Sequence, residues 1–147
     1  MMLASPRLQS GASLIEVMVS VLILSVGLLG VAAMQATALK NSQSALERSQ
    51  AVIESYAILD AIRANAEAGR NGAYTRGMTC AAPSGANLVD GDIGRWITSM
   101  KNSLGASACG AINCVAATRT CQITVRWDDG RGTAGSTAQE IVTVGRI

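Results

Sequence analysis

An uncharged apolar stretch near the amino terminus constrains what this chain can fold into. From Val17 to Leu39 the sequence contains no Asp, Glu, Lys or Arg. A helix of about 20 mostly apolar residues is long enough to cross the hydrocarbon core of a bilayer. Length and composition therefore predict that this stretch is a membrane-spanning helix.

A single carboxylate, Glu16, lies at the entrance of the apolar stretch. A charged side chain deep in a membrane costs about 2.5–3.5 kcal/mol, so a partner for Glu16 is expected. The first cation after it is Lys40, about 36 Å further along a helix that rises about 1.5 Å per residue. The partner is therefore expected to be the chain terminus or another molecule.

The run Gly11-Ala12-Ser13-Leu14-Ile15-Glu16 has a glycine, a glutamate five positions later, and an apolar span directly behind it. This pattern resembles the processing signature of type IV prepilins. In that family a membrane peptidase cuts after the glycine and N-methylates the new first residue, most often Phe where this chain has Ala12. The resemblance implies that residues 1–11 are a leader peptide and that Ala12 is the methylated mature terminus. It also implies that Glu16 acts in subunit assembly by facing a protonated amino terminus, its own or a neighbour's.

Two other interpretations of this segment stay open. A secretory signal peptide has an apolar core of about 7 to 15 residues and an A-x-A-like cleavage site. Ala36-Thr37-Ala38 fits such a site, but the apolar run is longer and a glutamate at its entrance is unusual. In a plain single-pass anchor, Glu16 would simply reach the membrane interface.

The helix is expected to continue past the apolar stretch, over about residues 13–66, because residues 31–68 contain no Gly or Pro. Its first half, residues 12–39, is the membrane and assembly part. Its second half, residues 40–66, is amphipathic and is expected to carry the rest of the chain.

Both halves contain residues with predicted roles. Gly27 and Gly30 interrupt the apolar half, where they allow close helix packing or local unwinding on assembly. In the amphipathic half, apolar residues at helical spacing predict a stripe that faces the domain. This stripe comprises Leu46, Val52, Ile53, Tyr56, Leu59 and Ile62, and the expected water-facing residues are Glu47, Arg48, Glu54, Asp60 and Arg63.

Residues 67–147 are expected to form a small exported domain. Residues 68–83 are rich in Gly and polar residues and predict a loop. Alternating apolar residues predict strands at 122–127 and 140–144, paired as an antiparallel hairpin against the long helix. The predicted fold is α+β and type IV pilin-like, with a long amino-terminal helix and a small carboxyl-terminal antiparallel sheet.

A second helix is predicted for residues 90–104. Either Asp90 or Asp92 can cap its start, and Gly105 is placed to end it. One face of this helix is apolar and is expected to pack in the core; it consists of Ile93, Trp96, Ile97, Met100 and Leu104.

The four cysteines, Cys80, Cys109, Cys114 and Cys121, all follow the apolar stretch. Disulfides persist in the bacterial periplasm, and the absence of a C-x-x-C pair argues against a redox or zinc site. Two disulfides are therefore expected, with three possible connectivities. We favour Cys114 with Cys121 across a short hairpin and Cys80 with Cys109; Cys109 with Cys114 is the main rival.

Composition argues against an enzyme or a nucleic-acid-binding protein. The chain has no His and none of the common nucleophile, metal-protease or phosphate-loop motifs, so neither catalysis nor a cofactor is expected. The formal net charge is only +2, of which Arg7 contributes one, and no basic stripe indicates binding to nucleic acid. Asp128-Asp129-Gly130 lacks the other ligand positions of a calcium loop and predicts a turn.

The long helix also resembles minor pilins of the PilV type. The resemblance lies in Gly27-Leu28-Leu29-Gly30, Gln35, Asn41-Ser42-Gln43, Arg48-Ser49-Gln50-Ala51 and Ile62-Arg63-Ala64-Asn65. It implies a minor pilin in the bacterial inner membrane, with a cytoplasmic amino terminus and a periplasmic domain, which later joins the pilus at the cell surface. It also implies three kinds of partner, namely other major and minor pilins, the prepilin peptidase and the inner-membrane assembly platform.

Two alternative functions remain open from the sequence. A minor pseudopilin of a type II secretion system would share every feature up to about Leu39. A pilus-tip module that binds a surface or DNA would differ in the exported domain.

Overall fold

A computed structural model describes residues 11 and 13–147 of the chain. The predicted leader, apart from Gly11, and the predicted mature terminus Ala12 lie outside the described residues. The chain divides into two compact units, Met1–Ala38 and Leu39–Ile147.

Helix α1 spans Leu14–Ala64 and contributes to both units. At its start the carbonyl oxygen of Ser13 accepts hydrogen bonds from the backbone N–H groups of Glu16 and Val17, at 3.0 and 3.2 Å. An acid in the first turn and Arg63 in the last turn both suit the helix dipole. The long helix predicted for about residues 13–66 is therefore confirmed, and a short helix, α2 (Ala66–Arg70), follows it.

The second unit contains a four-stranded antiparallel sheet with the strand order β1-β2-β3-β4. The strands are β1 (Arg76–Thr79), β2 (Cys109–Val115), β3 (Thr120–Trp127) and β4 (Gln139–Arg146), and helix α3 (Leu88–Leu104) connects β1 to β2. The predicted hairpin of residues 122–127 and 140–144 is confirmed as β3 and β4, and both strands are longer than predicted. The predicted α+β fold is thus the observed one.

The loop predicted for residues 68–83 is wrong, because this segment contains the end of α2 and all of β1. The strand β2 was not predicted either. Its Gly110, Ala111 and Asn113 are weak strand formers, so the segment shows little strand signal by itself. Pairing with β3 along its whole length determines its conformation.

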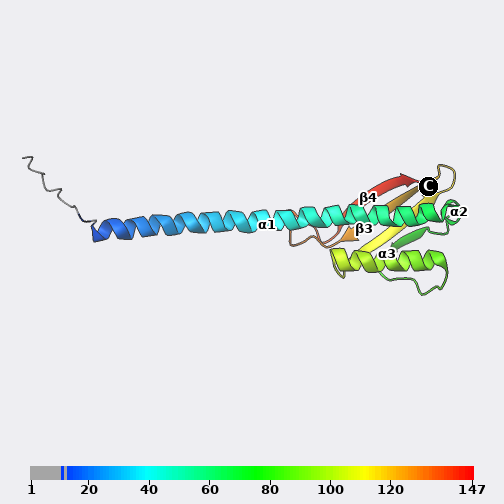
Figure 1. The fold of residues 1–147 in the computed structure, drawn as a ribbon, viewed down its shortest axis with the longest axis horizontal. Coiled ribbons are helices and arrows are strands. Elements are labelled where there is room, and N and C mark those ends of the chain that lie inside the picture. The colour runs from blue at the N-terminus through cyan, green and yellow to red at the C-terminus, as the bar shows by residue number, and fades with distance from the viewer. Residues whose placement is uncertain (1–10, 12) are drawn as a thin grey trace, which may run out of the picture. The chain divides into compact units, whose positions relative to one another are not determined.

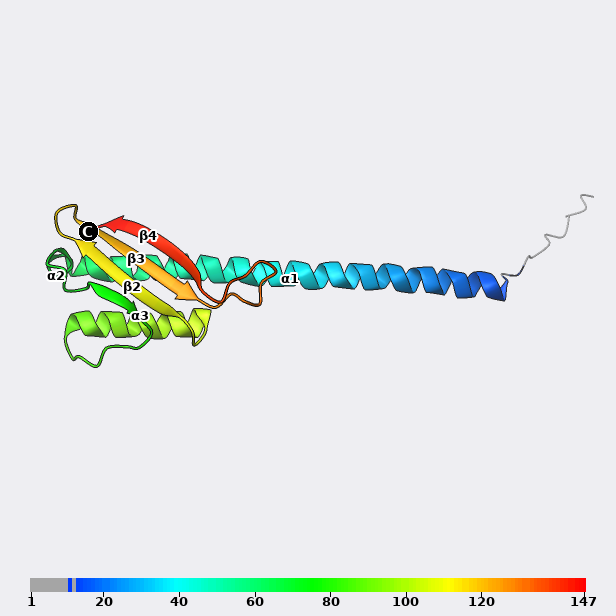
Figure 2. The same cartoon turned by 180° about the vertical axis from the view of Figure 1, so that it is seen from behind.

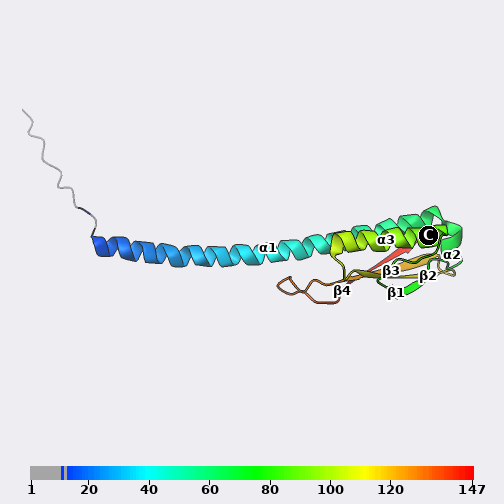
Figure 3. The same ribbon diagram turned by 90° about the horizontal axis from the view of Figure 1, so that it is seen from below.

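The second unit is built in two layers (Figure 3), with α3 and the adjoining part of α1 in one layer and the sheet in the other. In Figure 1 the sheet runs obliquely across this part of α1, and α3 lies beside it. The core lies between the two layers and includes buried residues of both helices and of β2 and β3. Its largest fully buried side chains are Trp127, Tyr74, Ile58, Leu59, Ile62, Ile93, Ile97, Met100, Ile112, Ile123 and Val125.

Helix α3 begins two residues before its predicted start. The predicted cap, Asp90 or Asp92, is wrong, because Asn87 is the N-cap and its side chain accepts a hydrogen bond from the N–H of Asp90 at 2.8 Å. Asparagine is as good an N-cap as aspartate, and here it lies three residues before the N–H that it caps. Gly105 ends the helix as predicted, at a positive φ of 98° that favours glycine.

The predicted apolar face of α3 is confirmed, because all five of its residues are buried. The ring of Trp96 packs on β2 at Gly110, where a Cβ atom would lie 2.3 Å from Trp96 Cη2. Only glycine allows the strand to approach the indole this closely. Gly110, although a weak strand former, is therefore the residue that lets α3 pack on the sheet.

The stripe predicted for the second half of α1 is wrong in part. Leu59 and Ile62 are buried as predicted, whereas Glu54, expected to face water, is only 6% exposed. Apolar side chains occur on both sides of this part of α1, so helical periodicity does not select the side that packs on the domain. The stripe members that are exposed instead are Leu46 (60%), Val52 (38%), Ile53 (57%) and Tyr56 (50%).

Candidate processing and assembly site

Gly11 is the residue before the predicted cleavage point, and it is exposed. A Cβ atom built at this position would meet no other atom within 4 Å. No contact among the described residues therefore requires glycine at position 11. A requirement for glycine would come from a molecule that binds this segment, such as a peptidase whose cleft holds the extended backbone.

Glu16 lies in the first turn of α1 and is exposed. Its backbone oxygen accepts a hydrogen bond from Ser20 Oγ at 2.7 Å, but its carboxylate takes part in no ion pair among residues 11 and 13–147. Its location near the positive end of the helix dipole is favourable for a carboxylate. The described chain thus offers a negative charge at the start of α1 that is available to another group.

The large apolar side chains from Val17 to Leu39 are exposed, from 50% at Val19 to 74% at Met34. Among the described residues, α1 is the one helix long and apolar enough to cross a membrane, and none of its most apolar stretch is buried within the chain. Exposed apolar surface of this extent marks contact with a membrane or with another protein.

Gly27 and Gly30 are helical, and a Cβ atom at either position would meet nothing within 4 Å. Neither glycine is required by a contact within the part of the chain that the structure describes. Their predicted role in close packing or local unwinding concerns an assembled state, and it stays a prediction.

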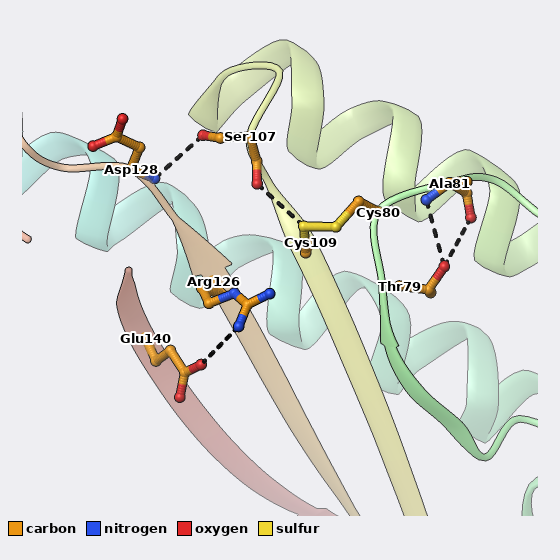
Figure 4. The surroundings of a disulfide bond; sticks show 8 residues. All are labelled: Thr79, Cys80, Ala81, Ser107, Cys109, Arg126, Asp128 and Glu140. Atoms are coloured by element: carbon orange, nitrogen blue, oxygen red, sulfur yellow. Dashed lines mark hydrogen bonds and ion pairs between the residues drawn. A yellow bond between two sulfur atoms is a disulfide. The ribbon is translucent and has the colours of Figure 1, made fainter. Parts of the chain in front are cut away.

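The four cysteines form two disulfides, Cys80–Cys109 and Cys114–Cys121, which is the pairing favoured from the sequence. Cys114 and Cys121 are directly opposite each other in the β2–β3 ladder. Cys80 follows β1 and joins it to the start of β2 (Figure 4). Both bonds therefore tie neighbouring strands of the same sheet.

Glu54 fixes α3 to α1, a role that the sequence analysis missed. Its carboxylate Oε1 accepts hydrogen bonds from Ser99 Oγ at 2.7 Å and from Ser103 Oγ at 3.2 Å. Its backbone oxygen accepts one from Trp96 Nε1 at 3.0 Å. The available signal was the spacing of Trp96, Ser99 and Ser103, which places two hydroxyl groups near the indole on one side of the helix.

Asp129 anchors the loop between β3 and β4 to α1. Its side chain is 3% exposed, and its Oδ2 accepts a hydrogen bond from Ser44 Oγ at 2.5 Å and lies 4.0 Å from Arg48 Nη2. Thr133, in the same loop, donates a hydrogen bond to the Asn41 side chain. The predicted turn at residues 128–130 is therefore also an attachment point, which periodicity does not reveal.

Tyr74 joins the end of α1 to α3 through its buried hydroxyl group. This hydroxyl donates to Asp92 Oδ2 at 2.5 Å and accepts from Asn65 Nδ2 at 3.3 Å. Burial raises the pKa of Tyr74 above its ordinary value, and the hydrogen bond to the Asp92 carboxylate raises it further. The tyrosine is therefore held in its neutral form.

Chemically, the amino-terminal segment has the features of a segment that another molecule recognises and acts on. An accessible glycine is followed by a carboxylate with no ion-pair partner in the described part of the chain and by an apolar helix. The second unit is a covalently stapled domain attached to the same helix through buried polar contacts.

Comparison with known families identifies one match, to the prokaryotic N-terminal methylation motif, over residues 6–32. No curated protein and no solved structure matches the chain. The motif is of the prepilin type, and with the long helix and the small antiparallel sheet it supports a type IV pilin-like protein. The motif and the apolar helix also indicate anchoring in a membrane.

Proposed function

We propose that this protein is a minor pilin of the PilV type that takes part in priming or decorating a type IV pilus. In this proposal the prepilin peptidase removes residues 1–11 and methylates Ala12. The processed chain waits in the inner membrane, with its domain in the periplasm, until the assembly platform transfers it to the pilus together with other pilins.

One observation carries the proposal. The methylation motif covers residues 6–32, and the same segment holds an accessible glycine, a carboxylate without an ion pair in the described chain, and exposed apolar side chains. A secretory signal peptide accounts for the apolar run but gives no role to the carboxylate. A plain anchor likewise leaves the glycine without a role.

Glu16 has a specific function in this proposal. When α1 moves from lipid into a protein core, its apolar side chains contact other helices, and an unpaired charge there is strongly unfavourable. A protonated amino terminus and the Glu16 carboxylate neutralise each other only when they lie side by side. This pairing determines how deeply α1 inserts into the protein core. Charge pairing therefore fixes the axial position of one subunit relative to the next.

The two disulfides suit an exported domain of this size. Oxidising conditions allow them to persist in the periplasm. The domain then reaches the pilus as a preformed unit, and assembly involves mainly the amino-terminal part of α1.

Processing can be tested with Gly11→Val, because a branched side chain would not fit a cleft that accepts glycine. We expect the variant to stay in the membrane as an uncut precursor. Gly27→Val is the matched control, since it adds the same side chain within the apolar stretch and should be processed normally. Mass spectrometry of the wild-type chain should find a methylated terminus at Ala12. A mature terminus at Leu39, or normal cleavage of Gly11→Val, would contradict the proposal.

A deletion strain separates a pilus role from a secretion role. Loss of pili and of twitching with normal protein secretion supports the pilin proposal. Loss of secretion with normal pili, together with co-purification of secretion components, would identify a pseudopilin instead. Loss of adhesion or DNA binding with intact pili would indicate a tip module.

A further inference from the structure

The two edges of the sheet differ in how they are protected. The β1 edge has only four residues and an irregular register with β2. The β4 edge has eight residues, Gln139–Arg146, and contains neither Pro nor Lys. In Figure 2, no other element of the described chain lies along the free side of β4. Proteins usually blunt a long edge strand, because its unpaired backbone groups can bind another strand.

The register shows which backbone groups of β4 face outward. The N–H of Ile147 donates to the carbonyl of Arg119 at 2.9 Å, and this pair continues the β3–β4 register of Cys121 with Gly145. Since bonded pairs alternate along an antiparallel ladder, the odd-numbered residues of β4 bond to β3. The N–H and C=O groups of the even-numbered residues therefore point to the free edge; these residues are Glu140, Val142, Val144 and Arg146.

One of these outward groups has a partner in the described chain, since the carbonyl of Arg146 accepts a hydrogen bond from Arg63 Nε at 3.0 Å. The middle of the edge, at Val142 and Val144, has no such contact among residues 11 and 13–147. These two valines are 54% and 63% exposed on the outer face of the sheet. The edge thus combines unpaired backbone groups with an apolar surface next to them.

Charged side chains flank the apolar centre of the edge. Glu140 lies near one end, with its Oε1 3.9 Å from Arg126 Nη1 on β3 (Figure 4). Arg146 lies at the other end and forms no ion pair among the described residues. The strand that best matches this edge has an acid beside Arg146, a base beside Glu140 and apolar residues between them.

We propose that the β4 edge receives an extended strand from a neighbouring pilin of a different sequence, so that the sheet continues across the subunit interface. This inference rests on the proposed function, which supplies neighbouring pilins. Backbone hydrogen bonds from Val142 and Val144 provide the binding energy, and the two valines with Arg146 select the partner strand.

A second copy of this chain is the less suitable occupant. Two β4 strands paired antiparallel about Thr143 would place Glu140 opposite Arg146 of the partner copy. However, the two-fold axis of such a pair is perpendicular to the sheet, and it makes the α1 segments beneath the two sheets run in opposite directions. Two copies held in one membrane by the same end of α1 do not suit that arrangement.

The first test uses Val142→Pro, which removes one outward N–H and leaves the inward bonds of Ile141 and Thr143 to β3 in place. Each lost hydrogen bond weakens binding by about two- to tenfold. Proline also prevents close approach of the next strand, so we expect about tenfold less of the variant in sheared pili. Val142→Thr keeps both the N–H and the branched side chain, and it should incorporate as the wild type does. Thiol labelling and thermal melting establish that each variant is folded.

The second test places a photo-crosslinking amino acid at Val144, in the full chain in piliated cells. We expect an adduct with another pilin, mapped by mass spectrometry to a strand at the edge of its sheet. The same group at Asn102, exposed on α3, should give no such adduct.

The outcomes separate the two proposals. An adduct between two copies of this chain would overturn the proposed occupant. Normal incorporation of Val142→Pro, or a Val144 adduct that maps only to a partner's helix, would overturn the edge proposal while the pilin function stands. Absence of the wild-type chain from sheared pili and from every complex with pilins would overturn the proposed function, and with it the edge proposal.

Discussion

The two parts of α1 use similar residues in different ways. In residues 14–38 the large apolar side chains are all at least half exposed. In residues 39–64 one side of the helix is buried, and its buried residues include Ala51, Ser55 and Glu54 as well as three large aliphatic side chains. The more apolar part of α1 is thus the part that no other described residue buries.

The comparison shows that apolar composition and burial within the chain are separate properties. Residues 14–38 have the composition and exposure of a segment that contacts lipid or another protein, and such a partner accepts any side of the helix. The buried side of residues 39–64 fits one particular partner, the domain. Small or hydrogen-bonding residues serve there because α3 and the sheet approach closely.

The largest expected effect comes from removing the one charge at the start of the apolar part. Glu16→Val should leave insertion and cleavage intact but prevent entry into pili, because an amino terminus without its counter-charge in a protein core costs about 3–5 kcal/mol. The measurement compares the variant's mature size in membranes with its amount in sheared pili. Glu67→Val is the control, since Glu67 is an exposed acid in α2. Normal incorporation of Glu16→Val would leave Glu16 without an assembly role.

The second prediction compares leucines on opposite sides of the domain-bearing part of α1. Leu59→Ala should lower the free energy of unfolding by about 2–5 kcal/mol, because Leu59 is fully buried. Leu46→Ala should change it by less than about 0.5 kcal/mol, because Leu46 is 60% exposed. Denaturant titration of the full chain in detergent can follow the buried Trp96 and Trp127. A larger effect of Leu46→Ala than of Leu59→Ala would mean that the domain packs on the other side of α1.

The sequence predicted the long helix from its apolar run and from the absence of Gly and Pro over residues 31–68, and it predicted α3 and the β3–β4 hairpin from their hydrophobic periodicity. It failed for β1 and β2, whose conformation depends on pairing with distant residues. It also assigned Leu46, Ile53 and Tyr56 to the core, because nothing local distinguishes an apolar side of α1 that meets the domain from one that does not. The buried Glu54 and Asp129 were not identified, since the hydroxyl groups that bind their carboxylates lie 45 or more positions away in the sequence.

For the candidate site, the sequence already contained the local features, namely Gly11, Glu16 and the apolar run. The structure adds that a Cβ atom at Gly11 would meet nothing within 4 Å and that the Glu16 carboxylate forms no ion pair among the described residues. The partner that gives them a role belongs to another molecule or to residues outside the described ones. In the proposed pilus, the axial position and stoichiometry of subunits depend on that partner, so one chain's sequence does not specify them.

The third prediction concerns the disulfides, which strengthen the domain and should leave the apolar part unaffected. From loop-closure entropy, Cys80–Cys109, with a sequence separation of 29, should contribute about 3–4 kcal/mol. Cys114–Cys121, with a separation of 7, should contribute about 2–3 kcal/mol. Double Cys→Ala variants, unfolded by denaturant, give these values. Thiol labelling of the denatured wild-type chain should find no free cysteine. A larger loss for the shorter loop would contradict the entropic ranking.

The smallest expected effect is a pH dependence of stability, which should appear in the domain-bearing part of α1 and not in residues 14–38. The domain-bearing part ends at the Tyr74 network, and the raised pKa of Tyr74 means that the folded chain holds its phenol proton more tightly than the unfolded chain. The stabilising contribution is therefore fully present below pH about 10, the ordinary pKa of tyrosine, and is lost as the pH rises above it.

Tyr74→Phe removes the hydrogen bond to Asp92, so it should destabilise the domain by about 1 kcal/mol at neutral pH. The difference from the wild type should shrink as the pH rises above about 10. Tyr56→Phe alters an exposed tyrosine and should follow the wild-type pH dependence.

Membrane association through residues 14–38 should not change over the same range, because that part of α1 has no group with a role in this titration. Unfolding measured at each pH by tryptophan fluorescence, with flotation on vesicles for the membrane-bound fraction, tests both parts together. A constant difference between Tyr74→Phe and the wild type across this range would show that the buried phenol does not determine the alkaline stability of the domain.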